Sequence, residues 1–132
     1  MNALQLFVLI GFVGFASTQW NLECKIQVKF RNDGHKKIRI DLIVPSLSIM
    51  SDPVVLTEWK EEKSVHIKGR NCEAKPWVFM IYGWQNDQWV LKKKTQSKFT
   101  GKGWFLTAVE EDYTLSVLDR HGIACSEGNC GK

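Results

Sequence analysis

Apolar and polar residues alternate along much of the chain. In the first such segment the apolar positions are Ile26, Val28 and Phe30, and polar residues separate them. A second alternation runs over residues 38–44 and stops at Pro45, which has no amide proton to donate to a sheet. A period of two places successive side chains on opposite faces of a strand, so each segment predicts a half-buried β-strand.

Further strand-like segments recur about every eight to twelve residues, with turn-forming residues between them. They cover residues 54–59, 65–67, 77–84, 89–91, 104–109 and 113–117. Residues 77–84 are apolar almost throughout, as in a central strand that is packed on both faces. Because no segment keeps a helical period for three turns, we expect an all-β fold, an antiparallel β-sandwich of seven or eight strands with an immunoglobulin-like or transthyretin-like architecture.

Three turns are predicted between these strands. Residues 32–34 (Asn-Asp-Gly) tolerate the positive φ that a hairpin turn requires, so we expect a hairpin there. The polar residues 85–88 predict a second hairpin, in which Trp84 and Trp89 face each other. Glycines flank a third predicted turn at residues 101–103.

The first 18 residues contain no charged residue and no cysteine. Leu4 to Phe15 is a largely apolar run of twelve residues, too short for a bilayer span of about 20 residues. Small residues follow at Ala16 and Thr18, as at a cleavage site, although no Lys or Arg precedes the run. We therefore expect residues 1–18 to be a signal peptide, with a buried N-terminal helix or strand as the alternative. Residues 19–132 would form a single secreted, extracellular domain without a membrane span.

All four cysteines lie after this leader and would meet an oxidising environment, where an even number favours disulfides. They are Cys24, Cys72, Cys125 and Cys130. Of the three connectivities we favour Cys24–Cys72 with Cys125–Cys130, because only a short glycine-containing turn separates the second pair. A metal site is the alternative, but the close cysteine pairs of structural zinc sites are missing. We expect no metal.

One run of the chain is strongly basic. Between residues 92 and 102 there are five lysines and no acidic residue, in a chain whose net charge is +4. These are Lys92, Lys93, Lys94, Lys98 and Lys102. Such a run attracts anionic partners such as glycosaminoglycans, phospholipid headgroups or nucleic acid. The alternative is that the lysines solvate an edge strand and prevent edge-to-edge pairing.

The chain is rich in tryptophan, with six among its 132 residues. In a sandwich most of these side chains are expected in the core. Trp84, Trp89 and Trp104 are the candidates for an exposed platform under a sugar ring, or for an anchor in a protein interface.

The histidines suggest an enzymatic alternative. A ribonuclease-like reaction pairs a histidine with a carboxylate as general base and acid, so His66 would act with Glu58 or Glu61 and with His121. Arg70 would hold the phosphate. His66 alternates outward on its strand, and His35 lies in a polar turn where it is expected to be solvated. No nucleophile-elbow, metalloprotease or phosphate-loop motif is present in the sequence. We therefore expect no catalytic residue.

Two short motifs and the late cysteines resemble the small secreted transthyretin-like proteins of nematodes. The first motif is Val65-x-Ile67-x-Gly69-x-x-Cys72-x-x-Lys75-Pro76, and the second contains Thr100, Gly101, Gly103 and Phe105. The resemblance covers roughly half of the chain after the leader; residues 20–63 precede it, and the family's acidic run is missing. It implies an extracellular β-sandwich of signalling or host-interaction type, without the hormone-binding channel.

We therefore expect a secreted, non-enzymatic binding protein that contacts an extracellular protein or glycan through loops and aromatic side chains. Segments 85–88 and 95–102 are the expected contact loops, because loops on a rigid scaffold carry recognition. The alternatives are a small secreted ribonuclease-like hydrolase and a lectin-like carbohydrate-binding module. Neither a cofactor nor a specific nucleic acid partner is expected.

Overall fold

The computed structural model describes residues 23–131, and the expected signal peptide at residues 1–18 lies outside them. The described part is almost entirely β-structure, with one short 3-10 turn, η1 (Pro45–Leu47). Its strands are β1 (Glu23–Asn32), β2 (Ile38–Val44), β3 (Ile49–Met50), β4 (Val54–Leu56), β5 (Glu62–Arg70), β6 (Trp77–Gln85), β7 (Gln88–Val109) and β8 (Leu115–Gly128). No helix among these residues is long and apolar enough to cross a bilayer.

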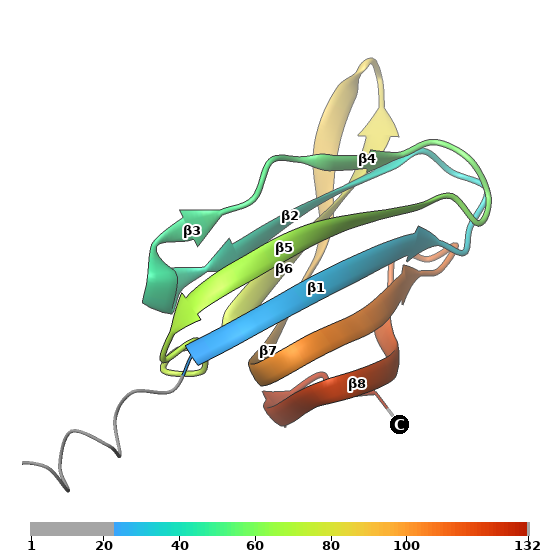
Figure 1. The fold of residues 1–132 in the computed structure, drawn as a ribbon. Coiled ribbons are helices and arrows are strands. Elements are labelled where there is room, and N and C mark those ends of the chain that lie inside the picture. The colour runs from blue at the N-terminus through green and yellow to red at the C-terminus, as the bar shows by residue number, and fades with distance from the viewer. Residues whose placement is uncertain (1–22, 132) are drawn as a thin grey trace, which may run out of the picture.

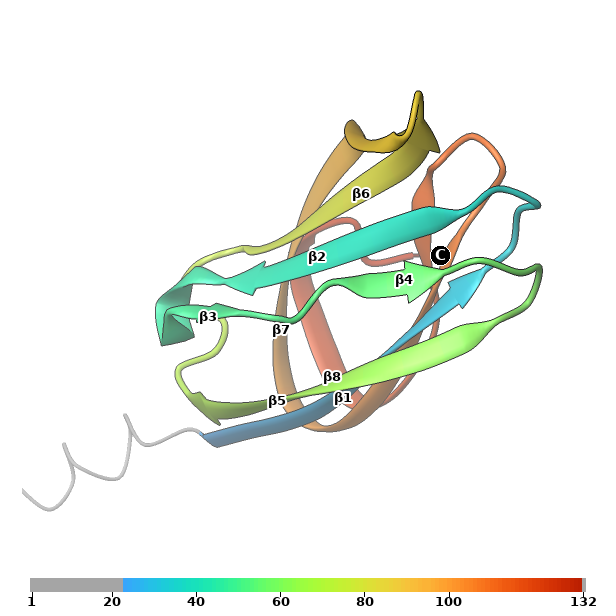
Figure 2. The ribbon, with the colours of Figure 1, turned by 90° about the horizontal axis from the view of Figure 1, so that it is seen from above.

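The eight strands form one hydrogen-bonded sheet in the order β3-β2-β6-β7-β1-β5, with β4 also paired to β2 and β8 to β7. The sheet curls on itself into a half-barrel (Figures 1 and 2). The predicted all-β, disulfide-stabilised fold is confirmed. The expectation of purely antiparallel pairing is wrong at one place, because β1 runs parallel to β7.

Strand β7 connects the two halves of the sheet. Its first part, residues 88–97, pairs with β6, and its last part, residues 102–109, pairs with β1. Between them the register against β8 shifts, and Gly101 adopts a φ of 119°, which disfavours any residue with a side chain. A Cβ at Gly101 would also collide with the carbonyl oxygen of Gly122. The predicted turn at residues 101–103 is therefore wrong, because the glycines bend one continuous strand instead of ending it.

The predicted hairpin at residues 32–34 is also wrong, since β1 pairs with β5 and β7 and not with β2. Asn32, with 1 % of its surface exposed, shapes the connection. Its Nδ2 donates to the carbonyl of Lys36 at 2.9 Å, and its Oδ1 accepts from the amide of Gly34 at 3.0 Å. The side chain thus holds a loop that carries the chain from one half of the sheet to the other.

The predicted hairpin around residues 85–88 is confirmed. Gln85 pairs with Gln88, and the two residues between them have φ values of 53° and 62°, as a type I′ turn requires. Trp84 lies opposite Trp89, with ring centroids 5.0 Å apart in an edge-to-face arrangement. The two rings therefore meet across the hairpin as the sequence predicts.

Aromatic side chains fill the space between the two halves of the sheet. Trp77 contacts Phe99 at a centroid distance of 5.3 Å, and Phe99 stacks on Phe105 at 4.1 Å. The indole nitrogen of Trp77 donates to the carbonyl of Cys72 at 2.8 Å, so the polar atom of this buried ring is satisfied.

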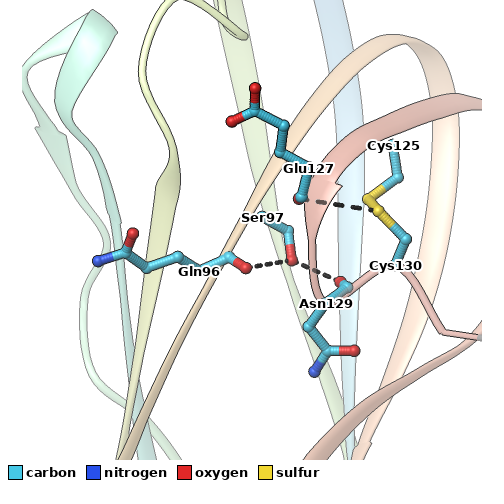
Figure 3. The surroundings of a disulfide bond; sticks show 6 residues. All are labelled: Gln96, Ser97, Cys125, Glu127, Asn129 and Cys130. Atoms are coloured by element: carbon cyan, nitrogen blue, oxygen red, sulfur yellow. Dashed lines mark hydrogen bonds between the residues drawn. A yellow bond between two sulfur atoms is a disulfide. The ribbon is translucent and has the colours of Figure 1, made fainter.

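The structure joins Cys24 to Cys72 and Cys125 to Cys130, the connectivity that we favour from the sequence. The first bond lies in the core, since both of its cysteines are buried. The second ties the C-terminal tail to β8, and the Ser97 hydroxyl of β7 contacts the carbonyl oxygens of Gln96 and Asn129 beside it (Figure 3). The amide of Asn129 also donates to the carbonyl of Gln96 at 3.0 Å.

Candidate anion-binding surface

The polar positions of β1 and β5 point away from the core, onto the face that we call the outer face. Buried positions alternate with these polar positions along β1, from Cys24 through Ile26 to Phe30. The outer face continues across the last part of β7 and across β8, because directly paired residues point to the same side of a sheet.

Three lysines lie side by side on the outer face. Lys25 of β1 is directly opposite Lys68 of β5 and Lys102 of β7. We call Lys25, Lys68 and Lys102 the lysine row. Adjacent strands are about 4.8 Å apart, so the row spans about 10 Å. All three side chains are exposed, and none forms an ion pair with an acidic residue among residues 23–131.

A shallow pocket of about 400 Å³ lies along the lysine row. Besides the three lysines, it is lined by Gln27 and His66 and by the neighbouring Ile26, Ile67 and Gly103. The residues around the pocket therefore include three lysines, an amide side chain and an imidazole.

The next row of the outer face contains both histidines of the enzymatic alternative. Pairing places His66, Gln27, Trp104 and His121 side by side on β5, β1, β7 and β8. Three strand spacings, about 14 Å, separate the two histidines. A general acid and a general base that act on one phosphate must both lie within hydrogen-bond reach of it. The structure does not bring this pair together.

Trp104 is contacted by side chains from both neighbouring strands. Lys29 Nζ lies 4.4 Å from the ring centroid, and the imidazole of His121 stacks at 6.1 Å. Lys29 comes from β1 and His121 from β8, which flank β7 on opposite sides. The indole is thus already in contact with two neighbouring side chains, unlike the expected open platform.

The other two candidate tryptophans lie at the tip of the β6–β7 hairpin. Trp84 is 42 % exposed, and Trp89 is partly buried. The ammonium group of Lys37 lies over both rings, at 4.2 Å from Trp84 and 5.3 Å from Trp89.

Trp59, which no sequence motif singles out, is 56 % exposed on the loop between β4 and β5. Its indole stacks on the imidazole of His35 at 5.8 Å, with only 5° between the ring planes. His35 is thus more than a solvated turn residue. We call Trp59, Trp84, Trp89, His35 and Lys37 the loop end. The β4–β5 and β1–β2 connections, which carry Trp59 and His35, lie side by side (Figure 2), and Lys37 links them to the β6–β7 hairpin.

The five lysines between residues 92 and 102 do not form one patch. Lys92 donates to Gln85 Oε1 at 2.6 Å, Lys93 donates to Thr114 Oγ1 at 2.7 Å, and Lys98 lies 3.4 Å from Glu127. Lys94 is opposite Met80 on the other half of the sheet. Only Lys102 joins the lysine row, because β7 passes from one half to the other within this run.

Ion pairs neutralise other basic side chains of the described chain. Arg31 Nε lies 2.7 Å from Asp33 Oδ1, and this hydrogen bond lowers the pKa of the Asp33 carboxyl. Lys60 lies 3.1 Å from the same oxygen. Arg39 likewise lies 2.7 Å from the buried carboxylate of Asp41. The lysine row differs from these pairs in having no such carboxylate.

No group of three or more His, Cys, Asp or Glu side chains that could hold a metal ion occurs within residues 23–131. No protein-family model and no curated protein sequence matches the chain. The resemblance to transthyretin-like proteins therefore stays a prediction.

Proposed function

We propose that this chain is a secreted, non-enzymatic binding protein that holds an anionic ligand on the lysine row. The observation that carries the proposal is the register of Lys25, Lys68 and Lys102, which sets three unpaired positive charges side by side. The two disulfides support secretion, because such bonds persist in oxidising compartments.

The lysine row works against the stability of the sheet when no ligand is bound. Like charges directly opposite each other in a sheet are destabilising. A bound anion removes this repulsion, and each charge-assisted hydrogen bond between an ammonium group and an anionic oxygen is stronger than a neutral one. The loss of repulsion and the new hydrogen bonds therefore both favour the bound state.

Binding to heparin, a dense polyanion, tests the proposal. In the test variant all three lysines of the row are replaced by glutamine. The control variant replaces Lys36, Lys92 and Lys94, which are exposed and also lie outside the ion pairs of the described chain. Both variants lose the same charge, so only position distinguishes them.

We expect the row variant to elute from a heparin column at clearly lower salt than the wild type, and the control variant to elute near the wild type. The slope of log K against log salt should fall by about one for each contacting lysine that is lost. Equal losses in the two variants would show that net charge alone drives binding, and the proposal would then be wrong.

A second candidate function uses the loop end, because the two most exposed tryptophans of the described chain, Trp59 and Trp84, lie there. Exposed tryptophan can stack on a sugar ring or anchor a protein partner. An array of uncharged glycans tests the lectin-like form of this function. Binding that is lost in Trp84→Ala but unchanged in the lysine-row variant would support it.

A further inference from the structure

We infer that the anionic ligand of the lysine row is a sulfated saccharide that lies across β5, β1 and β7. This inference rests on the proposed function and adds the chemical class of the ligand. It follows from the neutral polar side chains that adjoin the lysine row, and from the lack of free aromatic and exposed apolar side chains beside it in the described part of the chain.

Neutral hydrogen-bonding side chains lie directly beside the lysine row. Gln27 and His66 line the same pocket as the three lysines. Gln27 Nε2 also donates to Ser64 Oγ at 3.3 Å, so an amide, a hydroxyl and an imidazole share this side of the row. Gln27 and His66 lie two residues along the strands from Lys25 and Lys68, a distance of about 7 Å, and Ser64 lies two residues further along β5.

A sulfated sugar matches this division of the surface. Its sulfate groups can pair with the ammonium groups of the lysines. Its hydroxyl groups and ring oxygens can form hydrogen bonds with the amide and the imidazole, both of which donate and accept. The oxygens of a plain polyphosphate accept hydrogen bonds from the lysines and from the Gln27 amide nitrogen, but such a polymer has no hydroxyl group to donate to the Gln27 amide oxygen. The neutral side chains therefore separate a saccharide from a plain polyanion.

A single-stranded nucleic acid fits the outer face less well. Proteins that bind such strands stack the bases on aromatic side chains, and each stacked base contributes to affinity. Trp104 is the aromatic residue next to the lysine row, and its ring already contacts Lys29 and His121. A base would have to compete with these contacts in order to stack on Trp104.

An anionic membrane also fits poorly. Peripheral binding to a bilayer combines basic residues with apolar side chains that enter the interface. The isoleucines that line the pocket, Ile26 and Ile67, are buried in the core. None of the exposed large apolar side chains of residues 23–131 lines the pocket. These side chains are Met50, Trp59, Trp84, Leu91 and Leu118.

A competition experiment on the full secreted chain tests the inference. A fluorescent heparin oligosaccharide is displaced by unlabelled heparin, chemically desulfated heparin, inorganic polyphosphate, poly(U) or phosphatidylserine vesicles, at matched charge concentration. We expect heparin to displace the probe at concentrations about tenfold lower than polyphosphate, poly(U) or vesicles, and desulfated heparin to be ineffective.

The variant Gln27→Ala provides a second measurement, with Gln88→Ala on the β6–β7 hairpin as its matched control. We expect Gln27→Ala to weaken heparin binding by about three- to tenfold, the effect of one lost hydrogen bond, and to weaken polyphosphate binding clearly less. Gln88→Ala should change neither affinity. Melting curves show whether each variant is folded.

Two outcomes overturn the inference. One is that polyphosphate or poly(U) binds as tightly as heparin; the other is that Gln27→Ala affects both polymers equally or neither. If polyphosphate or poly(U) binds as tightly as heparin but this binding is lost in the lysine-row variant, only the assignment of a saccharide as the ligand fails. If no polyanion binds, or if the lysine-row variant binds like the wild type, the proposed function fails as well.

Discussion

Replacement of Lys25 by glutamate is expected to make the protein more stable, although it removes the centre of the lysine row. Lys25 lies opposite Lys68 on one side and Lys102 on the other. Like charges in this arrangement are destabilising, whereas an opposite-charge pair contributes about 0.2–1 kcal/mol. Lys25→Glu thus converts two repulsive pairs into two attractive ones.

The magnitude follows from these two pairs. Because the side chains are exposed and solvent screens them, we take about 0.5 kcal/mol for each pair. The free energy of unfolding should then rise by about 1 kcal/mol, which corresponds to an increase in Tm of about 4 °C for a domain of this size. In 1 M salt the Debye length is about 3 Å, shorter than the separation of opposed side chains, so the gain should largely disappear.

Thermal and urea unfolding at neutral pH, in low salt and in 1 M salt, measure this effect. The control is Lys94→Glu, which changes the net charge equally but lies opposite Met80 rather than another lysine. A gain in Lys25→Glu no larger than in Lys94→Glu, or a gain that persists in 1 M salt, would refute the reasoning. The same variant should bind heparin more weakly, so stability and binding should change in opposite directions.

Three further predictions concern the fold. Replacing the Cys24–Cys72 pair by serine, which opens a loop of 48 residues, should lower the free energy of unfolding by about 4 kcal/mol in urea titrations, against about 2 kcal/mol for the Cys125–Cys130 pair. Gly101→Ala should destabilise the domain by more than about 1 kcal/mol in the same titrations, because the left-handed φ and the neighbouring carbonyl exclude a Cβ. Asp33→Asn should be less stable than the wild type at pH 7, because Arg31 holds the pKa of the Asp33 carboxyl below its usual range. That difference is complete above the unfolded-state pKa of about 3.9 and should vanish as the pH falls through the lower folded-state pKa, which urea titrations at stepped pH would show. An equal difference at all pH values would contradict the role of the ion pair.

The strands could be predicted from the sequence because their signal is local. The alternation of Ile26, Val28 and Phe30 needs only neighbouring residues, and the structure buries each of these side chains. The β6–β7 hairpin was predictable for the same reason, since Trp84 and Trp89 are close in sequence as well as in space.

Pairing between strands that are distant in the sequence could not be predicted, because it depends on contacts that no local pattern reveals. The turn formers at residues 32–34 are compatible with a hairpin, yet the buried side chain of Asn32 uses them for a crossing loop. Glycines favour a turn in the sequence, whereas at Gly101 the same backbone freedom bends a strand that remains paired with β8.

The candidate site was missed for the same physical reason. Lys25 and Lys68 are each an ordinary polar position of an alternating strand, and nothing near them in the sequence sets them apart. The run of lysines from residue 92 to residue 102 is the strongest local signal of positive charge, but of its members only Lys102 lies in the lysine row. A site made by register across three strands has no signature within any one of them.

The passage of β7 through both halves of the sheet has a consequence for how the chain folds. Since the first part of β7 completes one half and the last part completes the other, neither half has all of its strands before β7 is in place. During synthesis β1 must therefore wait for its parallel partner until residue 109 has emerged, and contacts of such sequence separation slow folding. The two halves should then unfold in a single transition, and a chain that ends before β7 should not form a stable domain.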